Sequence, residues 1–461
     1  MVEPSIYATV KRAGFSAEKP IVVDSELRVE RGEAAMLVGP SGSGKTVFLL
    51  AITGVLKHFF NGYVEGSVKL AGLNPLAYSD YTKLPSKLGF VMQDPERQIL
   101  YPTPLDEAVA VLEARGFTYE EAHRRALEVL KLLGLFSKLE EHVENLSGGE
   151  KKRLAIALSL VHDPEVLILD EPSASLDTEG IAFVKKLVRE AVEKEHAVLL
   201  TEHKWRYFTD VASKAYVLVK HRVIPSTLDE LASTERKPEC KDSTLSSGSI
   251  VLETRNLSVG YKGIALVRNV DIYLRQGEVV ALVGPNGSGK TTILKTISGF
   301  LKPIEGEVVL KSSVFYAPQN PDVAFVHGSV EKELKNTARK TQVSFEDLSS
   351  MYPWFQSTRN LHPLRLSHGQ RRWLSLLIAY AYGKGVLLLD EPTTGLDYAL
   401  YNSLVKLVAK LKSEKRAVLV STHDPRFIAD VADRVYVVKD ARVFEEDKCR
   451  VVESMYSEVG L

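Results

Sequence analysis

Short runs of consecutive apolar residues recur along the chain, and segments with helical spacing separate them. In the first half these runs are Ala34–Val38, Val166–Leu169, Ala197–Leu200 and Tyr216–Val219. In the second half they are Val279–Val283, Val386–Leu389, Ala417–Val420 and Val435–Val438. Unbroken apolar strands spaced by helices are typical of a mostly parallel sheet that helices cover on both faces. The pattern therefore predicts an α/β fold in each half of the chain.

The two halves are copies of one unit, and their later motifs pair at one constant offset. The pairs are Ser147 with Ser367, Glu171 with Glu391, and His203 with His423, because 367 − 147 = 391 − 171 = 423 − 203 = 220. Lys45 and Lys290 are instead 290 − 45 = 245 residues apart, so the first copy has extra residues upstream of these motifs. A fixed offset over several motifs is the signature of an internal repeat.

Two further segments complete the predicted layout. Residues Val64–Leu70 alternate weakly, like a strand of a small antiparallel subdomain, and Gly306–Leu310 is the shorter equivalent in the second copy. The stretch Pro225–Ser249 is rich in Ser, Thr, Lys and Glu, which is typical of a solvated linker. We therefore expect a first domain, a linker and a second domain at residues 1–225, 226–249 and 250–461.

A glycine-rich loop follows the first apolar run of each copy and precedes a helical segment. Its residues in the first copy are Gly39, Pro40, Ser41, Gly42, Ser43, Gly44, Lys45 and Thr46. In the second copy they are Gly284, Pro285, Asn286, Gly287, Ser288, Gly289, Lys290 and Thr291, with Thr292 directly after. Backbone N–H groups in such a loop, and the helix N-terminus behind it, bind phosphates. Two loops in matching contexts predict two nucleoside triphosphate sites, where the lysine reaches the β- and γ-phosphates and the threonine ligates Mg²⁺.

Paired carboxylates end one apolar strand of each copy, Asp170-Glu171 in the first and Asp390-Glu391 in the second. Solvated carboxylates at a strand end are the ordinary alternative, but four apolar residues precede each pair. We expect the aspartate to bind Mg²⁺ and the glutamate to polarise the attacking water. Because adjacent acids repel each other, the cation is needed to keep both ionised.

Three further pairs of residues are candidates for the same sites. His203 and His423 each follow a strand, 33 residues after the strand-end aspartate (203 − 170 = 423 − 390 = 33). A lone histidine is usually structural, but two in register favour a contact with the γ-phosphate. Gln93 and Gln319 follow short apolar runs, where they either cap a strand or serve as catalytic residues and Mg²⁺ ligands. Phe15 and Tyr261, which each follow a glycine upstream of a loop, are core or surface aromatics or stack on a base.

A helix start lies before each acidic pair. In the first copy Ser147, Gly148 and Gly149 precede an apolar helical segment, and Ser147 with Glu150 fits a capping box. Glycines in a first turn cost stability, so they indicate a close approach of the backbone to an anion. The second copy has Ser367, His368 and Gly369, and His368 departs from the first copy.

Composition excludes several classes of protein. The 59 basic and 59 acidic residues cancel, so no nucleic-acid partner is expected. The two cysteines, Cys240 and Cys449, imply neither an iron–sulfur domain nor a disulfide framework, and Cys240 is expected to be an exposed thiol. No apolar stretch approaches the roughly 20 residues that span a bilayer, and the N-terminus does not resemble a signal peptide. We therefore expect a cytoplasmic location.

Together these motifs resemble those of ATP-binding cassette (ABC) ATPases over nearly the whole chain. The phosphate loop, glutamine loop, signature motif, strand-end Asp-Glu, D-loop and switch histidine appear in the family order. The glutamine loops are at Gln93 and Gln319, the signature motifs at Leu146–Glu150 and Leu366–Gln370, and the D-loops at Ser175-Leu176-Asp177 and Gly395-Leu396-Asp397. The resemblance implies two tandem P-loop domains, each with a mostly parallel sheet, a small antiparallel subdomain and a helical subdomain. It also implies ATP and Mg²⁺ as cofactors, and a head-to-tail sandwich in which each signature motif covers the ATP of the other domain. Glu171 and Glu391 then predict two hydrolysis-competent sites, although His368 adds a side chain beside the triphosphate of the first.

The segments Gln93–Gln98 and Gln319–Asp322, and the pair Glu202-His203, are similar to those of energy-coupling factor ATPases. That resemblance implies a fused A1–A2 subunit that powers a vitamin or metal-ion importer. It implies transmembrane T and substrate-binding S components as separate chains, and a peripheral location at the cytoplasmic side of the cell membrane.

The alternative is a soluble tandem ABC ATPase that acts on ribosomes or in translation. Against it, the recycling factors need an iron–sulfur domain, and the ABC-F proteins usually have a long, charged helical linker. A DNA-repair ATPase of this family would need a long coiled coil, and the chain has no sustained heptads.

Overall fold

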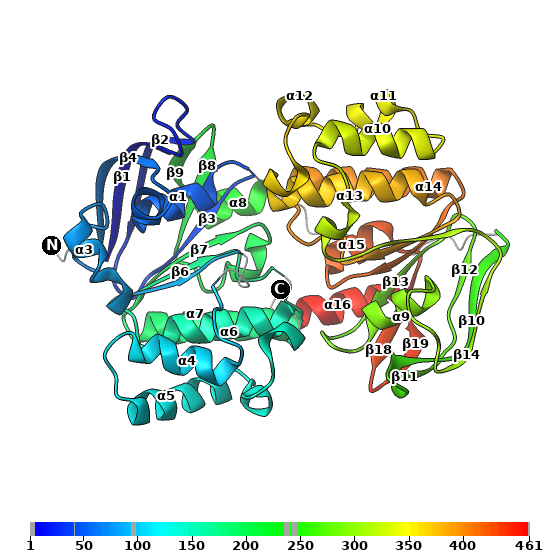
Figure 1. Cartoon of the computed structure of the whole chain (residues 1–461), viewed down its shortest axis with the longest axis horizontal. Coiled ribbons are helices and arrows are strands. Elements are labelled where there is room, and N and C mark those ends of the chain that lie inside the picture. Colours follow the sequence, from blue (N-terminus) through cyan, green and yellow to red (C-terminus); the bar gives the residue numbers. More distant parts are fainter. Residues whose placement is uncertain are drawn as a thin grey trace. The chain divides into compact units, whose positions relative to one another are not determined.

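The computed structural model describes residues 5–40, 42–93, 98–146, 148–174, 176–234, 240 and 248–459 (Figure 1). Contacts divide the chain into two compact units, residues 1–236 and 237–460. We call them domain 1 and domain 2 and describe each by itself. The predicted limits of the linker, residues 226 and 249, stay a prediction.

Domain 1 is built on a six-stranded sheet in the order β5-β6-β7-β3-β8-β9, parallel except for β9. These strands are β3 (Ala34–Val38), β5 (Leu88–Val91), β6 (Val166–Asp170), β7 (Ala197–Glu202), β8 (Lys214–Val219) and β9 (Arg222–Ser226). An antiparallel sheet contains β1 (Ile6–Gly14), β2 (Val22–Val29) and β4 (Tyr63–Leu70). The helices are α1 (Lys45–Ile52), α2 (Val55–His58), α3 (Tyr78–Tyr81), α4 (Pro104–Glu113), α5 (Tyr119–Leu132), α6 (Gly148–Leu160), α7 (Thr178–Glu193) and α8 (Leu228–Thr234).

Domain 2 repeats this plan with the order β15-β16-β17-β13-β18-β19. These strands are β13 (Val279–Val283), β15 (Val314–Ala317), β16 (Val386–Asp390), β17 (Ala417–Ser421), β18 (Arg434–Lys439) and β19 (Arg442–Glu446). Its antiparallel sheet contains β10 (Ile250–Tyr261), β11 (Ile264–Val270), β12 (Tyr273–Arg275) and β14 (Glu305–Leu310). The helices are α9 (Lys290–Ile297), α10 (Val330–Lys340), α11 (Phe345–Ser350), α12 (Phe355–Thr358), α13 (His368–Tyr382), α14 (Tyr398–Ser413), α15 (Pro425–Val431) and α16 (Lys448–Glu458). The predicted α/β class, the tandem copies and the antiparallel subdomains are confirmed.

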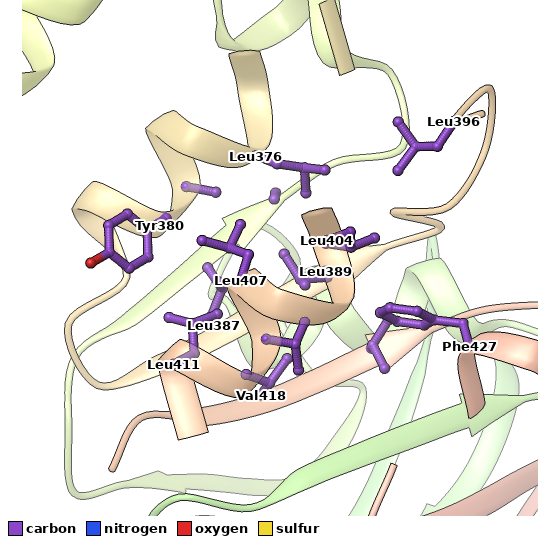
Figure 2. Close-up of a cluster of buried hydrophobic side chains, with 14 of the residues drawn as sticks. Leu376, Tyr380, Leu387, Leu389, Leu396, Leu404, Leu407, Leu411, Val418 and Phe427 are labelled. Carbon is purple, nitrogen blue, oxygen red and sulfur yellow. The ribbon is translucent and has the colours of Figure 1, made fainter. Parts of the chain in front are cut away.

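Each central sheet is buried on both faces, which explains why its strands are apolar without alternation. In β16, Leu387 and Leu389 belong to one buried cluster, and Val386 and Leu388 belong to another. Figure 2 shows the first cluster, where side chains from α13 and α14 pack on the sheet. Its labelled members are Leu376, Tyr380, Leu387, Leu389, Leu396, Leu404, Leu407, Leu411, Val418 and Phe427. Burying one such leucine contributes about 1.5–3 kcal/mol, so this packing fixes the strands that carry the site.

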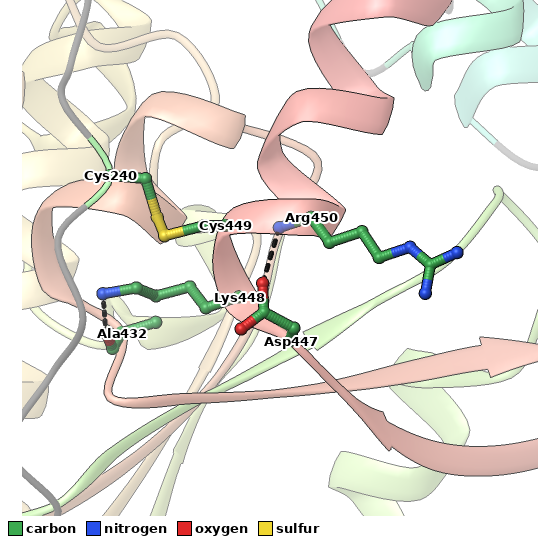
Figure 3. Close-up of a disulfide and its surroundings, with 6 residues drawn as sticks. All are labelled: Cys240, Ala432, Asp447, Lys448, Cys449 and Arg450. Atoms are coloured by element: carbon green, nitrogen blue, oxygen red, sulfur yellow. Dashed lines mark hydrogen bonds between the residues drawn. A yellow bond between two sulfur atoms is a disulfide. The ribbon is translucent and has the colours of Figure 1, made fainter.

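The expectation for the cysteines is wrong, because Cys240 and Cys449 form a disulfide (Figure 3). Cys449 lies in the first turn of α16, where Asp447 caps the helix by accepting a hydrogen bond from the Arg450 N–H at 2.8 Å. Cys240 is half-buried and packs against the apolar core of domain 2. The sequence does not indicate this disulfide, because 209 residues separate the two cysteines.

We expect the Cys240→Ser/Cys449→Ser variant to lower the free energy of unfolding of domain 2 by about 2–4 kcal/mol, because the cross-link restricts the unfolded chain. Urea unfolding followed by circular dichroism measures the change. Reductant should destabilise the wild type by a similar amount and leave the double variant unaffected. Equal midpoints for the wild type with and without reductant would contradict the expectation.

Candidate functional site

The glycine-rich loop of domain 1 joins β3 to α1, as predicted. Gly42 and Gly44 have φ of 74° and 110°, a left-handed conformation that side chains disfavour. The Lys45 ammonium is buried and donates to the carbonyls of Gly39 at 2.8 Å and Pro40 at 3.2 Å. This folds the loop around the N-terminus of α1. Ser41 lies outside the described residues.

The loop of domain 2 has the same form between β13 and α9. Gly287 and Gly289 have φ of 79° and 101°, and Lys290 donates to Gly284 O at 2.7 Å and Pro285 O at 2.9 Å. Pro40, Asn286 and Thr292 occupy the predicted places in or next to these loops, and Thr292 is buried in α9. The two loops therefore match in the backbone conformation of their glycines and in the contacts of their lysines.

Two buried hydroxyls test whether these loops fit an anion. Among the described residues, Ser43 Oγ and Ser288 Oγ have no hydrogen-bond partner. A buried polar atom without a partner costs about 1–3 kcal/mol, so an acceptor supplied from outside stabilises it. Each hydroxyl lies beside the first glycine of its loop, where an added Cβ would come within 3.1 Å of Ser43 Oγ and 3.0 Å of Ser288 Oγ. Both loops thus fit the oxygens of a phosphate chain.

The strand-end aspartates lie beside the loop threonines in both domains. Thr46 Oγ1 donates to Asp170 Oδ2 at 2.8 Å, and Thr291 Oγ1 donates to Asp390 Oδ1 at 3.2 Å. Burial raises the pKa of Asp170, and the adjacent Glu171 raises it further. A cation at this place would favour the ionised carboxylate, so the hydroxyl–carboxylate pair fits a divalent metal ion.

The strand-end glutamates are fixed by the neighbouring strand. Glu171 and Glu391 have φ of 50° and 47°, which costs about 1–3 kcal/mol for a residue with a side chain. The Glu171 N–H donates to Thr201 Oγ1 at 3.0 Å, and the Glu391 N–H donates to Ser421 Oγ at 3.2 Å. These hydroxyls also donate to the strand-end aspartates at 2.5 Å in both domains. Thr201 and Ser421 are not among the residues predicted from the sequence, although a hydroxyl at the repeat offset of 421 − 201 = 220 residues is a usable signal.

The predicted histidines contact the glutamates directly. His203 Nε2 lies 2.8 Å from Glu171 Oε1, and His423 Nε2 lies 3.1 Å from Glu391 Oε1. His203 Nε2 also lies 3.5 Å from Lys45 Nζ. The structure therefore brings the loop lysine, the glutamate and the histidine of domain 1 together. The predicted contact of the histidines with a γ-phosphate stays a prediction.

The glutamines differ between the domains. Gln93 Nε2 donates to Glu171 Oε2 at 2.7 Å, whereas the side chain of Gln319 is exposed. In domain 2 the hydroxyl of Tyr316 donates to Asp390 Oδ2 at 2.8 Å. The residue that matches Tyr316 in domain 1 is Phe90, because 316 − 90 = 319 − 93 = 226. The two sites are therefore chemically unequal.

A third buried carboxylate lies near the site of domain 1. Glu202 accepts hydrogen bonds from the N–H and the hydroxyl of Ser173, both at 2.8 Å. Burial raises the pKa of Glu202. Domain 2 has Thr422 in the equivalent position. Glu202 thus holds the start of the loop after Glu171, which an acid at the end of an apolar strand could have indicated.

The signature motifs begin helices in both domains. Gly148 and Gly149 are the first residues of α6, and Ser147 lies outside the described residues. In domain 2, Ser367 and Gln370 form a full capping box at the start of α13, and Gly369 follows in the first turn. The ring of His368 lies against Gly395 of its own domain, where an added Cβ would come within 2.1 Å of His368 Nδ1.

The predicted base-stacking aromatics lie at the ends of β1 and β10. Phe15 and Tyr261 expose 55% and 44% of their surface, respectively. Phe15 contacts Phe60 edge to face, with ring centroids 6.1 Å apart. A stacking role for either ring stays a prediction.

The amino-acid sequence of this chain is similar to sequences of known proteins. The family described as ABC transporter matches residues 22–174 and 267–394. A protein of Methanosarcina mazei, provisionally named an ABC transporter ATP-binding protein, is 30% identical and the match covers 94% of this chain and 92% of that protein. A protein of Bacillus subtilis, provisionally named an HMP/thiamine import ATP-binding protein, is 30% identical with 94% and 90% covered. The predicted tandem ABC domains are confirmed.

Solved structures match over almost the whole chain. One is described as ribosome-bound archaeal Pelota and ABCE1, with a TM-score of 0.75, 21% identity, and coverage of 98% of this chain and 80% of that chain. Another is the RNase-L Inhibitor, with a TM-score of 0.65, 20% identity, and coverage of 94% and 89%. At this identity the likeness shows the fold.

These structures contradict three predictions made from the sequence. They are the energy-coupling factor importer, its T and S partners, and the location at the cytoplasmic side of the cell membrane. All three follow from the resemblance of the glutamine-loop segments and the pair Glu202-His203 to energy-coupling factor ATPases. The same tandem fold occurs in a ribosome-bound protein, so the fold does not specify a membrane partner. Within the described ranges, every helix is too short or too polar to cross a bilayer.

We expect Glu171→Gln and Glu391→Gln each to remove the ATP turnover of one site and to leave ATP binding intact, because the amide cannot accept a proton from water. The double variant should lower kcat by about 10²-fold or more. Phosphate release and nucleotide binding are the measurements.

The matched control is Glu26→Gln, which changes an exposed carboxylate on β2. Turnover that is unchanged in Glu171→Gln would show that the domain 1 glutamate does not act in hydrolysis.

Proposed function

We propose that this chain, which belongs to the ABC transporter family, binds ATP with Mg²⁺ at two sites and uses its hydrolysis for mechanical work on a ribosomal particle. The twinned loop, carboxylate pair and histidine carry the ATPase part of this proposal. The ribosomal part is supported by the tandem fold that the chain shares with ribosome-bound ABCE1. A role on ribosomes is also the alternative to an importer that the sequence leaves open.

At each site the loop N–H groups and the lysine hold the phosphate chain. Lys45 and Lys290 are already buried against loop carbonyls, so little side-chain freedom is lost when ATP binds. Thr46 with Asp170, and Thr291 with Asp390, would hold Mg²⁺. The ion supplies positive charge to the β- and γ-phosphates.

The glutamates polarise the attacking water. Glu171 and Glu391 are aimed by their backbone N–H bonds to β7 and β17, and the contacts with His203 and His423 fix their carboxylates. Such fixed groups act by orientation and charge, without covalent chemistry.

Each ATP is then covered by the signature motif of the other domain. In this proposal Ser367 and Gly369 complete the site of domain 1, and Ser147 and Gly149 complete that of domain 2. The helix N-termini of α6 and α13 supply positive potential to the phosphates. Loss of the γ-phosphate removes the attraction, so the domains separate and move a bound partner.

The experiment uses the Glu171→Gln/Glu391→Gln variant, which should stay in its ATP-bound form. Cell extract is supplemented with MgATP, and ribosomal and membrane fractions are separated on sucrose gradients. All samples have the same salt concentration, because binding to nucleic acid depends on ionic strength. We expect the variant to sediment with ribosomal particles only when ATP is present.

The matched control is Lys45→Ala/Lys290→Ala, which should not bind ATP and should stay at the top of the gradient. Recovery of the trapped variant in membranes with a multispanning protein would overturn the ribosomal role. That outcome would agree with coupling to transmembrane transport, as the names of the curated relatives say of those proteins.

A further inference from the structure

Two buried cations occupy equivalent positions in the helices that begin at the signature motifs. They are Lys152 in α6 and Arg372 in α13, at the repeat offset of 372 − 152 = 220 residues. Each exposes only 1% of its surface. A buried cation is costly unless it is hydrogen-bonded, so its partners show what holds it there.

Lys152 connects α6 with the hydrolysis centre of its own domain. Its ammonium donates to the backbone carbonyls of Met92 at 3.1 Å and Gln93 at 3.3 Å, which belong to the glutamine loop. It also donates to Asp170 O at 3.3 Å, at the end of β6. One side chain therefore joins the signature helix to both segments that aim side chains at ATP.

Arg372 makes the same connection in domain 2. Its Nη1 donates to Pro318 O at 2.7 Å and Gln319 O at 3.1 Å, and its Nη2 donates to Asp390 O at 2.5 Å. Its Nε also donates to Pro392 O at 3.4 Å, directly after Glu391. Burial lowers the pKa of Arg372 to about 10, while Asp390 and Glu391 oppose the shift, so the side chain is charged at neutral pH.

We propose that Lys152 and Arg372 are positioning residues that tie the glutamine loop and the strand-end carboxylates of each domain to its signature helix. This inference rests on the proposed ATPase function, although not on the identity of the partner. A helix moves as a rigid element, so a shift of α13 displaces Gln319 and the Asp390-Glu391 pair with it. The position of the signature helix thereby sets the position of the catalytic groups within each domain.

The chemistry of the contacts explains why the residue is a cation. Three backbone carbonyls converge on Lys152, and four converge on Arg372. An apolar side chain of similar length would fill the space but leave these carbonyls without a donor. An ammonium can serve three of the four acceptors of Arg372, as Lys152 does in domain 1.

The test compares Arg372→Met with Arg372→Lys in a Glu171→Gln background, where turnover comes from the domain 2 site. We expect Arg372→Met to lower kcat by about 10- to 100-fold, because misplaced catalytic groups lose rate steeply. The KM for ATP should change by less than about twofold, because the phosphate loop is untouched. Arg372→Lys should retain most of the rate.

The matched control is Arg416→Met. Arg416 also donates to two backbone carbonyls of the α13 region, Tyr380 O at 2.6 Å and Gly383 O at 3.3 Å, but at the opposite end of the helix. Its loss should lower the melting temperature as Arg372→Met does, without the loss of kcat. Equal kcat for Arg372→Met and Arg416→Met, or equal loss in Arg372→Met and Arg372→Lys, would overturn the inference.

The equivalent set in domain 1 serves if Arg372→Met does not fold. Lys152→Met and Lys152→Arg are then compared in a Glu391→Gln background, with the same expected results. Normal ATP turnover without ribosome binding would overturn the ribosomal function and leave this inference standing. Absence of turnover in the wild type would overturn both.

Discussion

The hydrogen bonds between the carboxyl ends of adjacent parallel strands are the constraint on which both sites depend. Asp170 pairs with Thr201 in register, and Asp390 pairs with Ser421. The hydroxyl of Thr201 or Ser421 donates a hydrogen bond to the aspartate side chain and accepts one from the N–H of the glutamate that follows. Because helices and the antiparallel sheet bury the two faces of each central sheet, this edge cannot shift without disturbing the core. The left-handed glutamates are stable only in that setting.

The two copies keep this constraint and vary what surrounds it. In domain 1 Gln93 donates a hydrogen bond to Glu171, and Glu202 accepts one from Ser173. In domain 2 Tyr316 instead donates a hydrogen bond to Asp390. These contacts change the hydrogen bonding of residues that would meet the metal ion or the water. Duplication thus supplies two sites of one design, and single substitutions make them unequal.

Much of the fold and the candidate site could be predicted from the sequence. Apolar strands and the loops that follow them place Lys45, Asp170, Glu171 and His203 at one sheet edge, since carboxyl ends of parallel strands meet there. A contact that occurs in one copy only, such as that of Tyr316 with Asp390, cannot be predicted from the repeat, because the other copy has a different residue at that position. The Cys240–Cys449 disulfide joins distant segments, so only the tertiary structure reveals it. The partner could not be predicted, because proteins that share one fold can differ in function and in the partners that they bind.

The number of ATP molecules bound per chain tests most directly whether each domain holds an ATP site. Equilibrium dialysis of the Glu171→Gln/Glu391→Gln variant with radiolabelled ATP and Mg²⁺ gives this number without turnover. We expect two equivalents per chain, and one equivalent when either Lys45 or Lys290 is replaced by alanine. One equivalent or none in the parent variant would contradict this expectation.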